Sequence, residues 1–156
     1  MTEIRQARLD DADGISAVLI ASIRELCLPD HNNDPAAIGA WIANKTPDQV
    51  RIWLEGAHGI RVATQDGEIA SVGAISHDGR ILLLYAAPRH AGRGHCKALL
   101  HSMEEELAAL GHDEGRLVST KAAHPFFLAR GWQNEGPAVE FFRTRGQPMR
   151  KRLARG

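Results

Sequence analysis

The amino-acid sequence predicts an α/β protein of the α+β type, built on a mixed, mostly antiparallel sheet of six to seven strands with four to five flanking helices. Helical segments lie between the expected strands, and the later strands are joined in hairpins. This combination favours a mixed sheet. The length of 156 residues fits a single domain, residues 1–156, that buries a real core.

The N-terminal part is expected to form one strand and one long helix. Residues 3–8 alternate loosely between apolar and polar side chains, which indicates a strand. Asp10 and Asp11 then offer caps for a helix that Pro29 ends. The apolar face of this helix is formed by Ile15, Val18, Leu19, Ile23 and Leu26.

A polar loop at residues 30–33 is expected to lead into two shorter helices. Asp34 followed by Pro35 is typical of a helix start, with the aspartate as cap and the proline in the first turn. The run Thr46-Pro47-Asp48-Gln49 is a capping-box pattern, which predicts a further helix that ends near Gly56.

The middle of the chain is expected to form a hairpin and then a central strand. Residues 59–65 and 68–77 are predicted strands, and Asp66-Gly67 between them is a strong hairpin signal. Residues 81–87 form an unbroken apolar run, which fits a strand covered on both faces. Pro88 ends the run, because proline has no N–H to donate to a ladder.

A turn rich in glycine and basic residues, residues 89–94, leads from this strand into a helix. The opening amides of a helix lack intrahelical partners and lie at the positive end of the dipole, and glycines let a ligand come close. We therefore predict a phosphate or pyrophosphate site, with a purely geometric turn as the alternative. The dinucleotide pattern G-x-G-x-x-G fails, because Lys97 occupies its third glycine position. The helix has apolar positions at Leu99, Met103, Leu107 and Leu110 and closes at Gly111.

The C-terminal part is expected to add a strand, a short helix and a final hairpin that turns at Arg145-Gly146. The basic run near the end of the chain is interpreted as a solvated edge strand and tail, because lysine and arginine protect sheet edges. Attraction of an acidic protein or RNA is the alternative for this run, which consists of Arg143, Arg145, Arg150, Lys151, Arg152 and Arg155. The segments are residues 115–119 (strand), 122–130 (helix, capped by Gly131), and 132–144 with 147–153 (hairpin).

Two motifs resemble those of the GNAT N-acetyltransferases, in their small bacterial-type branch with a P-F-F motif. The segment PRHAGRGHCKALL, residues 88–100, resembles the acetyl-CoA loop P-x-x-[Q/R]-G-x-G-[I/V]-[G/A]-x-x-L-L of that family. The segment TKAAHPFFLARGW, residues 120–132, is similar to its S-x-x-A-x-P-F-[F/Y]-x-x-x-G-[F/W]. The motifs lie in the expected order and separation, and the resemblance extends over almost the whole chain.

The resemblance implies direct transfer of the acetyl group of acetyl-CoA to an amine, on a GNAT-like sheet. The pantetheine arm would lie along residues 84–87, a backbone amide near Ala86 would stabilise the developing oxyanion, and the amides of residues 92–97 would bind the pyrophosphate. The residues expected to bind the coenzyme are Leu84, Tyr85, Ala86, Ala87, Ala91, Gly92, Arg93, Gly94, His95, Cys96, Lys97, Thr120, Phe126 and Phe127. Attraction of the adenine-side phosphate of CoA is a further alternative for the basic run near the end of the chain.

Four positions depart from the family pattern. Ala91 replaces the usual Gln or Arg of the loop, His95 replaces its apolar residue, and Cys96 replaces its last small residue. Phe127 stands where many relatives carry the tyrosine thought to protonate the departing thiolate.

The sequence offers few groups for proton transfer. Tyr85 is the only tyrosine and would lie beside the thioester, so it is the first candidate for the acid, with a core aromatic as the alternative. His90 and His95 flank the glycine turn without a matched set of ligands, so no metal site is predicted. The candidate bases are Glu25, His77 and His124, each with an ordinary surface or capping role as the alternative.

Composition gives no sign of a nucleic-acid or membrane partner. The chain has 19 Lys and Arg against 19 Asp and Glu, and it carries neither a signal peptide nor an apolar run of membrane-spanning length. Its two cysteines, Cys27 and Cys96, make no disulfide framework, which indicates a reducing, cytoplasmic location.

Three functions stay open at this point. The first is acetylation of a small-molecule amine, the second is acetylation of a protein amino group, and the third is a non-catalytic CoA-binding module. Residues 24–34 look like part of a compact pocket more than a docking groove, which favours the first. The resemblance leaves monomer and homodimer open.

Overall fold

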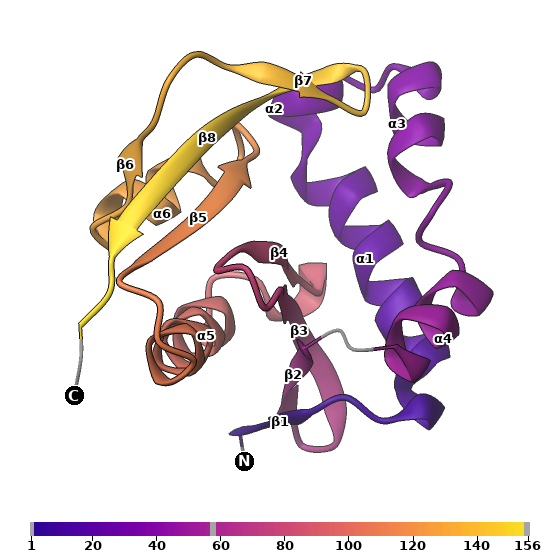
Figure 1. The fold of residues 1–156 in the computed structure, drawn as a ribbon. Coiled ribbons are helices and arrows are strands. Elements are labelled where there is room, and N and C mark those ends of the chain that lie inside the picture. Colours follow the sequence, from indigo (N-terminus) through magenta and orange to yellow (C-terminus); the bar gives the residue numbers. More distant parts are fainter. Residues whose placement is uncertain (1, 57–58, 155–156) are drawn as a thin grey trace.

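The computed structural model describes residues 2–56 and 59–154. Their strands form two antiparallel sheets, one of order β1-β2-β3-β4 and one of order β5-β8-β6 with β7 also paired to β8 (Figure 1). The predicted fold class is confirmed, although the strands divide into two sheets instead of forming one sheet of six to seven strands.

The strands are β1 (Thr2–Gln6), β2 (Gly59–Gln65), β3 (Glu68–Ile75), β4 (Ile81–Ala86), β5 (Glu114–Ser119), β6 (Gln133–Asn134), β7 (Val139–Phe141) and β8 (Thr144–Arg152). The α-helices are α1 (Ala12–Leu26), α2 (Leu28–His31), α3 (Pro35–Ile42), α4 (Pro47–Glu55), α5 (His95–Ala109) and α6 (His124–Ala129). Short 3-10 turns precede α1 (Leu9–Asp11) and follow β4 (Pro88–His90). No helix among the described residues is both long and apolar enough to cross a membrane.

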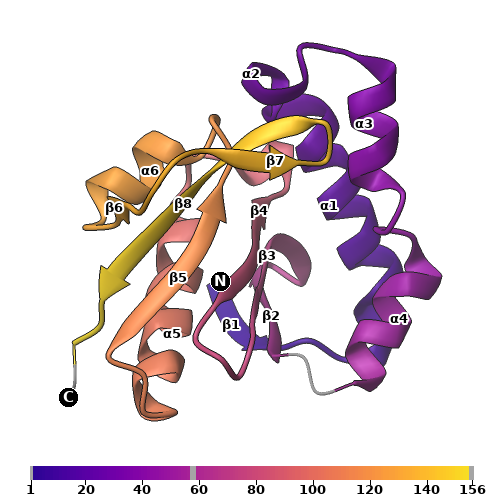
Figure 2. The ribbon, with the colours of Figure 1, turned by 45° about the horizontal axis from the view of Figure 1, so that its top comes forward.

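The first sheet lies between α1 on one face and α5 on the other (Figures 1 and 2). Val62 and Val72 on its strands pack in one cluster with Ile15 and Leu19 of α1. On the opposite face α5 approaches the backbone of β3 at Gly73, where a Cβ atom would lie 2.7 Å from the Met103 sulfur. The second sheet packs against the other side of α5, so this helix is shared by both sheets.

Several local predictions are confirmed by the backbone and its caps. The β2–β3 hairpin turns at Asp66 and Gly67, both with positive φ as a two-residue hairpin requires. The Asp34 carboxylate accepts a hydrogen bond from Ala36 N at the start of α3, and the Thr46 hydroxyl accepts one from Gln49 N at the start of α4.

The polar loop predicted at residues 30–33 is wrong, because its first half continues as the short helix α2. Asp30 and His31 are both buried there and both have partners. A ring nitrogen of His31 hydrogen-bonds Ile23 O at 2.8 Å, and the Asp30 carboxylate accepts from the backbone of the β5–α6 loop. Polar side chains of this stretch therefore serve tertiary contacts that no local pattern reveals.

The final hairpin turns three residues earlier than predicted. Phe142 and Arg143 have φ of 47° and 64°, and β7 pairs with β8 across them. Arg145 and Gly146 lie inside β8. Gly146 is required by packing and not by a turn, because a Cβ atom there would collide with the Val118 side chain and lie 3.3 Å from the Phe141 Cβ.

Two further predictions about exposure are corrected. β4 is not covered on both faces: Leu82 is 47% exposed, and the residues after it are only partly buried. Leu110 was expected on the apolar face of α5, but it is 45% exposed, because α5 ends at Ala109.

Candidate functional site

A gap between the two sheets creates the main cavity of the protein. β4 is the last strand of the first sheet and β5 the first strand of the second, and in the described residues they are joined only by a parallel bridge between Arg80 and Arg116. β4 also carries a bulge at Leu82, and a bulge bends a strand. The strands therefore separate beyond the bridge, and a cavity of about 730 Å³ occupies the space between them.

The edge of β4 that faces this gap presents unpaired backbone groups. Ala87 N donates to Ala70 O at 2.8 Å, so its amide points toward β3. Amides alternate in direction along a strand, which turns those of Leu84 and Ala86 toward the gap. Both residues line the cavity. An extended ligand that carries amides and carbonyls can hydrogen-bond this edge as a further strand would.

The glycine turn supplies a second set of free amides at one end of the cavity. Gly92 and Gly94 have φ of 76° and 89°, and Gly94 directly precedes the first residue of α5. The first α-helical hydrogen bond here runs from Ala98 N to Gly94 O, so the amides of the preceding turn have no intrahelical acceptor. The turn lines the cavity through Gly92 and Gly94, with Lys97 beside them. Its geometry and helix dipole suit a bound anion.

Arg130, at the C-terminal end of α6, lines the same cavity. Its guanidinium stacks on the Phe126 ring at 3.9 Å and donates to Phe126 O at 2.8 Å, which fixes its orientation. Its Nε is buried without a hydrogen-bond partner. The group also lies close to Cys96: burial raises the pKa of that thiol to about 12, and the positive charge of Arg130 opposes the increase.

The side chains of His90 and His95 are held away from solvent beneath the turn. A ring nitrogen of His90 lies 3.0 Å from a Glu68 oxygen, and one of His95 lies 3.2 Å from the Gln65 side-chain oxygen. The two rings meet edge to face with centroids 5.6 Å apart. In the part of the chain that the structure describes, no three His, Cys, Asp or Glu side chains form a group that could hold a metal ion.

Tyr85 lies on the opposite face of β4 from Leu84 and also lines the cavity. Its phenol oxygen accepts a hydrogen bond from Trp41 Nε1 at 3.2 Å. Desolvation by the surrounding protein raises the pKa of Tyr85 well above its ordinary value, and the nearby Cys27 adds to the effect. The phenol therefore keeps its proton throughout the neutral range.

One wall of the cavity comes from Tyr85 of β4, the end of α1 with the following Cys27, and the β7–β8 hairpin, and we call its five residues the acceptor wall. The Phe141 ring meets the Trp41 ring edge to face at 5.3 Å, and Phe142 stacks on Trp41 at 6.3 Å. Burial raises the pKa of the Cys27 thiol to about 12, with a smaller contribution from Asp30, so this thiol is uncharged. The acceptor wall consists of Ser22, Leu26, Cys27, Tyr85 and Phe141.

Asp30 organises the loop that closes the cavity between β5 and α6. Its two carboxylate oxygens accept from Lys121 N at 2.6 Å and Ala122 N at 3.1 Å. In the same loop the Thr120 hydroxyl accepts from Ala123 N at 3.0 Å. Thr120, predicted to lie near the coenzyme, therefore lines the cavity with its hydroxyl already engaged by the backbone.

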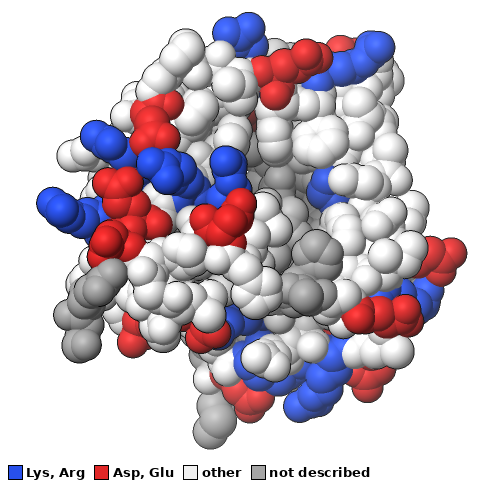
Figure 3. All heavy atoms as spheres, viewed as in Figure 1, with Lys and Arg blue, Asp and Glu red and all other residues white. Residues whose placement is uncertain are grey.

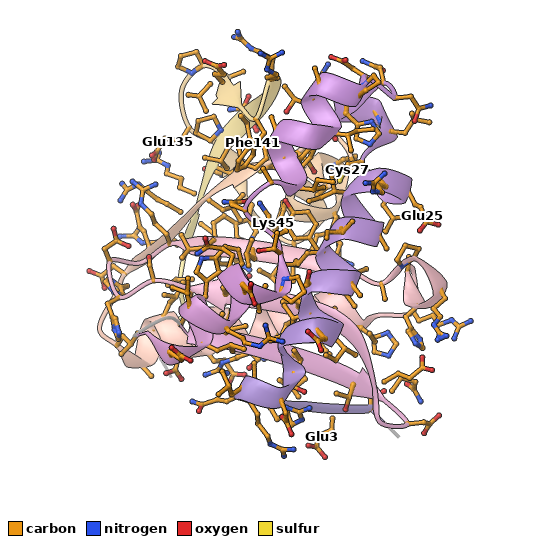
Figure 4. The ribbon with its side chains drawn as sticks, turned by 90° about the vertical axis from the view of Figure 1, so that its right-hand side faces the viewer. Glu3, Glu25, Cys27, Lys45, Glu135 and Phe141 are labelled. Atoms are coloured by element: carbon orange, nitrogen blue, oxygen red, sulfur yellow. The ribbon has the colours of Figure 1, made fainter. Side chains whose placement is uncertain are left out.

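The structure brings most of the predicted site residues together. All of the residues expected to bind a coenzyme line the cavity except Ala87, which is buried, and Arg93, which is exposed. The candidate bases lie elsewhere. Glu25 is exposed and points outward in Figure 4, whereas His124 hydrogen-bonds Asn134 and His77 lies outside the cavity.

Several site residues that the structure reveals were not assigned from the sequence, among them Cys27, Phe141 and Arg130. Cys27 and Phe141 lie on the acceptor wall, and Arg130 lines the cavity at the end of α6. Cys27 and Phe141 come from segments far apart in the chain, and Figure 4 shows both in the interior of the molecule. For Arg130 a signal was present, because it belongs to the second motif, but the pattern assigns no role to its position.

The basic C-terminal run does not form a continuous positive surface. Lys151 Nζ lies 2.7 Å from a Glu104 oxygen, and Arg150 Nε lies 3.7 Å from a Glu135 oxygen. Basic and acidic side chains are interspersed at the left of Figure 3, over the second sheet. β8, which carries most of this run, pairs with β5 on one side and with β6 and β7 on the other, so the predicted edge strand is wrong, although Arg145, Arg150 and Arg152 are exposed.

The chain matches a known protein family and is similar to several solved structures. A family model described as "Acetyltransferase (GNAT) domain" matches residues 27–153. No curated protein sequence matches significantly. Among solved structures, the chain is similar to a GCN5-related N-acetyltransferase from Rhodopseudomonas palustris, with 23% identity, a TM-score of 0.88, and 98% of this chain and 96% of the other covered.

Two similar structures were solved with a coenzyme. One is the PaiA N-acetyltransferase from Thermoplasma acidophilum in complex with coenzyme A, at 18% identity and a TM-score of 0.83, with 98% of this chain and 99% of that chain covered. The other is YncA from Salmonella typhimurium with acetyl-CoA, at 17% identity and a TM-score of 0.74, with coverage of 99% and 95%. At these identities the likeness shows a shared fold.

Proposed function

The chain belongs to the GNAT acetyltransferase family, and from that premise we propose that it transfers the acetyl group of acetyl-CoA to the primary amine of a small molecule. The observation that supports this proposal most strongly is the gap between β4 and β5. It combines a free strand edge, a glycine turn with free amides and an uncharged wall in one cavity.

The residues of the cavity fit acetyl-CoA, the acetyl donor of this family. We propose that the amides of residues 92–97 bind the diphosphate, with Lys97 and Arg130 adding positive charge from either side. The backbone of Leu84 and Ala86 would bind the pantetheine arm along the open edge of β4. The amide of Ala86 would then face the thioester carbonyl and stabilise negative charge that develops on its oxygen.

Tyr85 is the proposed general acid. It is held by Trp41, stays protonated at neutral pH, and belongs both to β4 and to the acceptor wall. In the transfer step the amine nitrogen attacks the thioester carbon, the carbon–sulfur bond breaks, and the phenol proton passes to the leaving thiolate. Glu25, His77 and His124 are not part of this proposal, because they do not line the cavity.

The amine must enter without its proton, and the cavity favours that form without a dedicated base. No Asp or Glu is among the described lining residues, and the residues outside the described ranges are not acidic either. Positive groups and a low-polarity wall both lower the pKa of a bound amine, which raises its neutral fraction.

We also propose that residues 1–156 act as one domain, and that the two free cysteines function in a reducing cytoplasm.

The test is thiol release from acetyl-CoA over a panel of primary amines, measured beside calorimetric binding of coenzyme A. We expect turnover on at least one small amine. The variant Tyr85→Phe should bind coenzyme A as the wild type does and lose kcat by about 100-fold. Tight binding with no turnover on any amine would identify a non-catalytic binding module instead, and unchanged turnover in the variant would remove the acid role of Tyr85.

A further inference from the structure

The acceptor wall is uncharged throughout. Its five side chains offer two hydroxyls, one thiol kept neutral by burial, and apolar surface. The charged side chains that line the rest of the cavity are all basic: Lys97 and Arg130 near the glycine turn, and Arg80 at the bridge, where it pairs with Asp78. A positively charged group on an acceptor therefore meets no carboxylate on any lining residue that the structure describes.

A buried lysine lies behind this wall. Lys45 is 2% exposed, and its ammonium donates to Trp41 O at 3.1 Å and to the Asn44 side chain at 2.5 Å. It lies 4.6 Å from the centre of the Phe142 ring, which in turn packs on Phe141 of the wall. None of these partners is a carboxylate. Within the described chain its charge is therefore not neutralised by an ion pair, and it adds positive potential behind the wall.

Asp30 is the carboxylate that acts electrostatically on Tyr85 and Cys27. It does not line the cavity, and each of its oxygens accepts a backbone N–H of the β5–α6 loop. Binding a cation there would compete with the two hydrogen bonds that hold the loop. Asp30 therefore does not supply a free anionic site for a second amino group.

From these charges we infer that the acceptor is a small amine with an apolar body and a single amino group, and that diamines and polyamines are excluded. This inference rests on the proposed function and specifies its substrate. The amino group that reacts enters neutral, whereas a second amino group would enter the cavity protonated. It would lose its hydration without gaining a counter-charge, and this is costly in a low-polarity site.

Two amines with the same six-carbon chain provide the direct test. Values of kcat/KM for n-hexylamine and 1,6-diaminohexane should differ by about tenfold or more in favour of the monoamine, and spermidine should be poorer still. Equal or better turnover of the diamine or of spermidine would overturn the inference while leaving the acetyltransferase proposal intact. Failure of every amine, with coenzyme A still bound, would overturn the proposed function itself.

A negative charge placed on the wall should reduce this preference for the monoamine. Leu26 ends α1, is only partly buried, and lines the cavity, so it tolerates a polar replacement. Leu26→Glu should raise the diamine-to-monoamine ratio of kcat/KM by about tenfold. Leu26→Gln introduces a side chain of the same shape as glutamate but without the charge, so it should leave the ratio near the wild-type value. An equal ratio in the two variants would show that wall charge does not select the acceptor.

Discussion

Lys45 is a single buried charge that destabilises the folded state. It lies in the core between α3 and α4, with Ser16 donating to its backbone oxygen at 2.6 Å. Burial lowers the pKa of its ammonium from 10.5 to about 8. Below pH 8 Lys45 is protonated in both the folded and the unfolded chain. In that range the buried charge lowers the free energy of unfolding by its full amount.

The pH dependence of stability tests this arrangement. Between pH 8 and 10.5 the unfolded chain binds more protons at this site than the folded chain, so the contribution of Lys45 to the free energy of unfolding rises with pH. Lys45→Met should therefore be more stable than the wild type at pH 7, by up to about 3 kcal/mol, and the difference should shrink by pH 10. Urea unfolding at both pH values measures it. An equal difference at the two pH values would contradict the shifted pKa.

A second prediction about a single residue concerns Arg130 and the binding of coenzyme A. Its oriented guanidinium lines the cavity close to Cys96, so Arg130→Gln should weaken binding of coenzyme A by about tenfold. Arg150→Gln removes a positive charge from the exposed face of β8 and serves as the matched control. Titration of coenzyme A and of its 3′-dephospho form would show which phosphate is contacted. A wild-type dissociation constant for both ligands in Arg130→Gln would refute the contact.

At the scale of the elements, β8 has to lie close to both of its neighbours. Gly146 lies where β8 passes Val118 of β5 and Phe141 of β7. Gly146→Ala should therefore lower the free energy of unfolding by about 2 kcal/mol, because the added methyl forces strands apart. Gly39→Ala is the control: it lies in α3 with no atom within 4 Å of the new methyl, and it should stabilise by up to about 1 kcal/mol. Denaturant unfolding compares the two, and a harmless Gly146→Ala would contradict the close packing of Gly146 against Val118 and Phe141.

Elements whose signals are local were predictable from the sequence. The Asp66-Gly67 hairpin and the caps Asp34 and Thr46 use only residues within four positions of each other, and all three appear in the structure. The turn at Phe142 and Arg143 was not predictable, because neither residue type favours positive φ. Its position follows from pairing with β8 and from the rings that Trp41 contacts, both of which are long-range contacts.

The exposure of β4 also depends on partners far away in the chain. An apolar run such as residues 81–87 usually indicates a strand covered on both faces, but β4 meets β5 only at the Arg80–Arg116 bridge and borders the cavity beyond it. Because β4 and β5 separate, the backbone of Leu84 and Ala86 borders the cavity, and so does the glycine turn.

At the scale of the whole molecule, the two sheets and the helix α5 between them determine the site. The coenzyme-loop residues were predictable, because the turn, the helix start and the motif lie within one short stretch of sequence. The acceptor wall was not, because α1 and the β7–β8 hairpin meet only when the second sheet has packed against the first.

The most direct test of this site is a crystal structure of the protein with acetyl-CoA. We expect diphosphate oxygens within about 3 Å of backbone nitrogens between Gly92 and Lys97, and the thioester carbonyl beside the amide of Ala86. We also expect the pantetheine arm to hydrogen-bond the open edge of β4. A coenzyme bound elsewhere, or held at the turn by side chains alone with the edge of β4 unoccupied, would contradict the assignment of this cavity as the acetyl-transfer site.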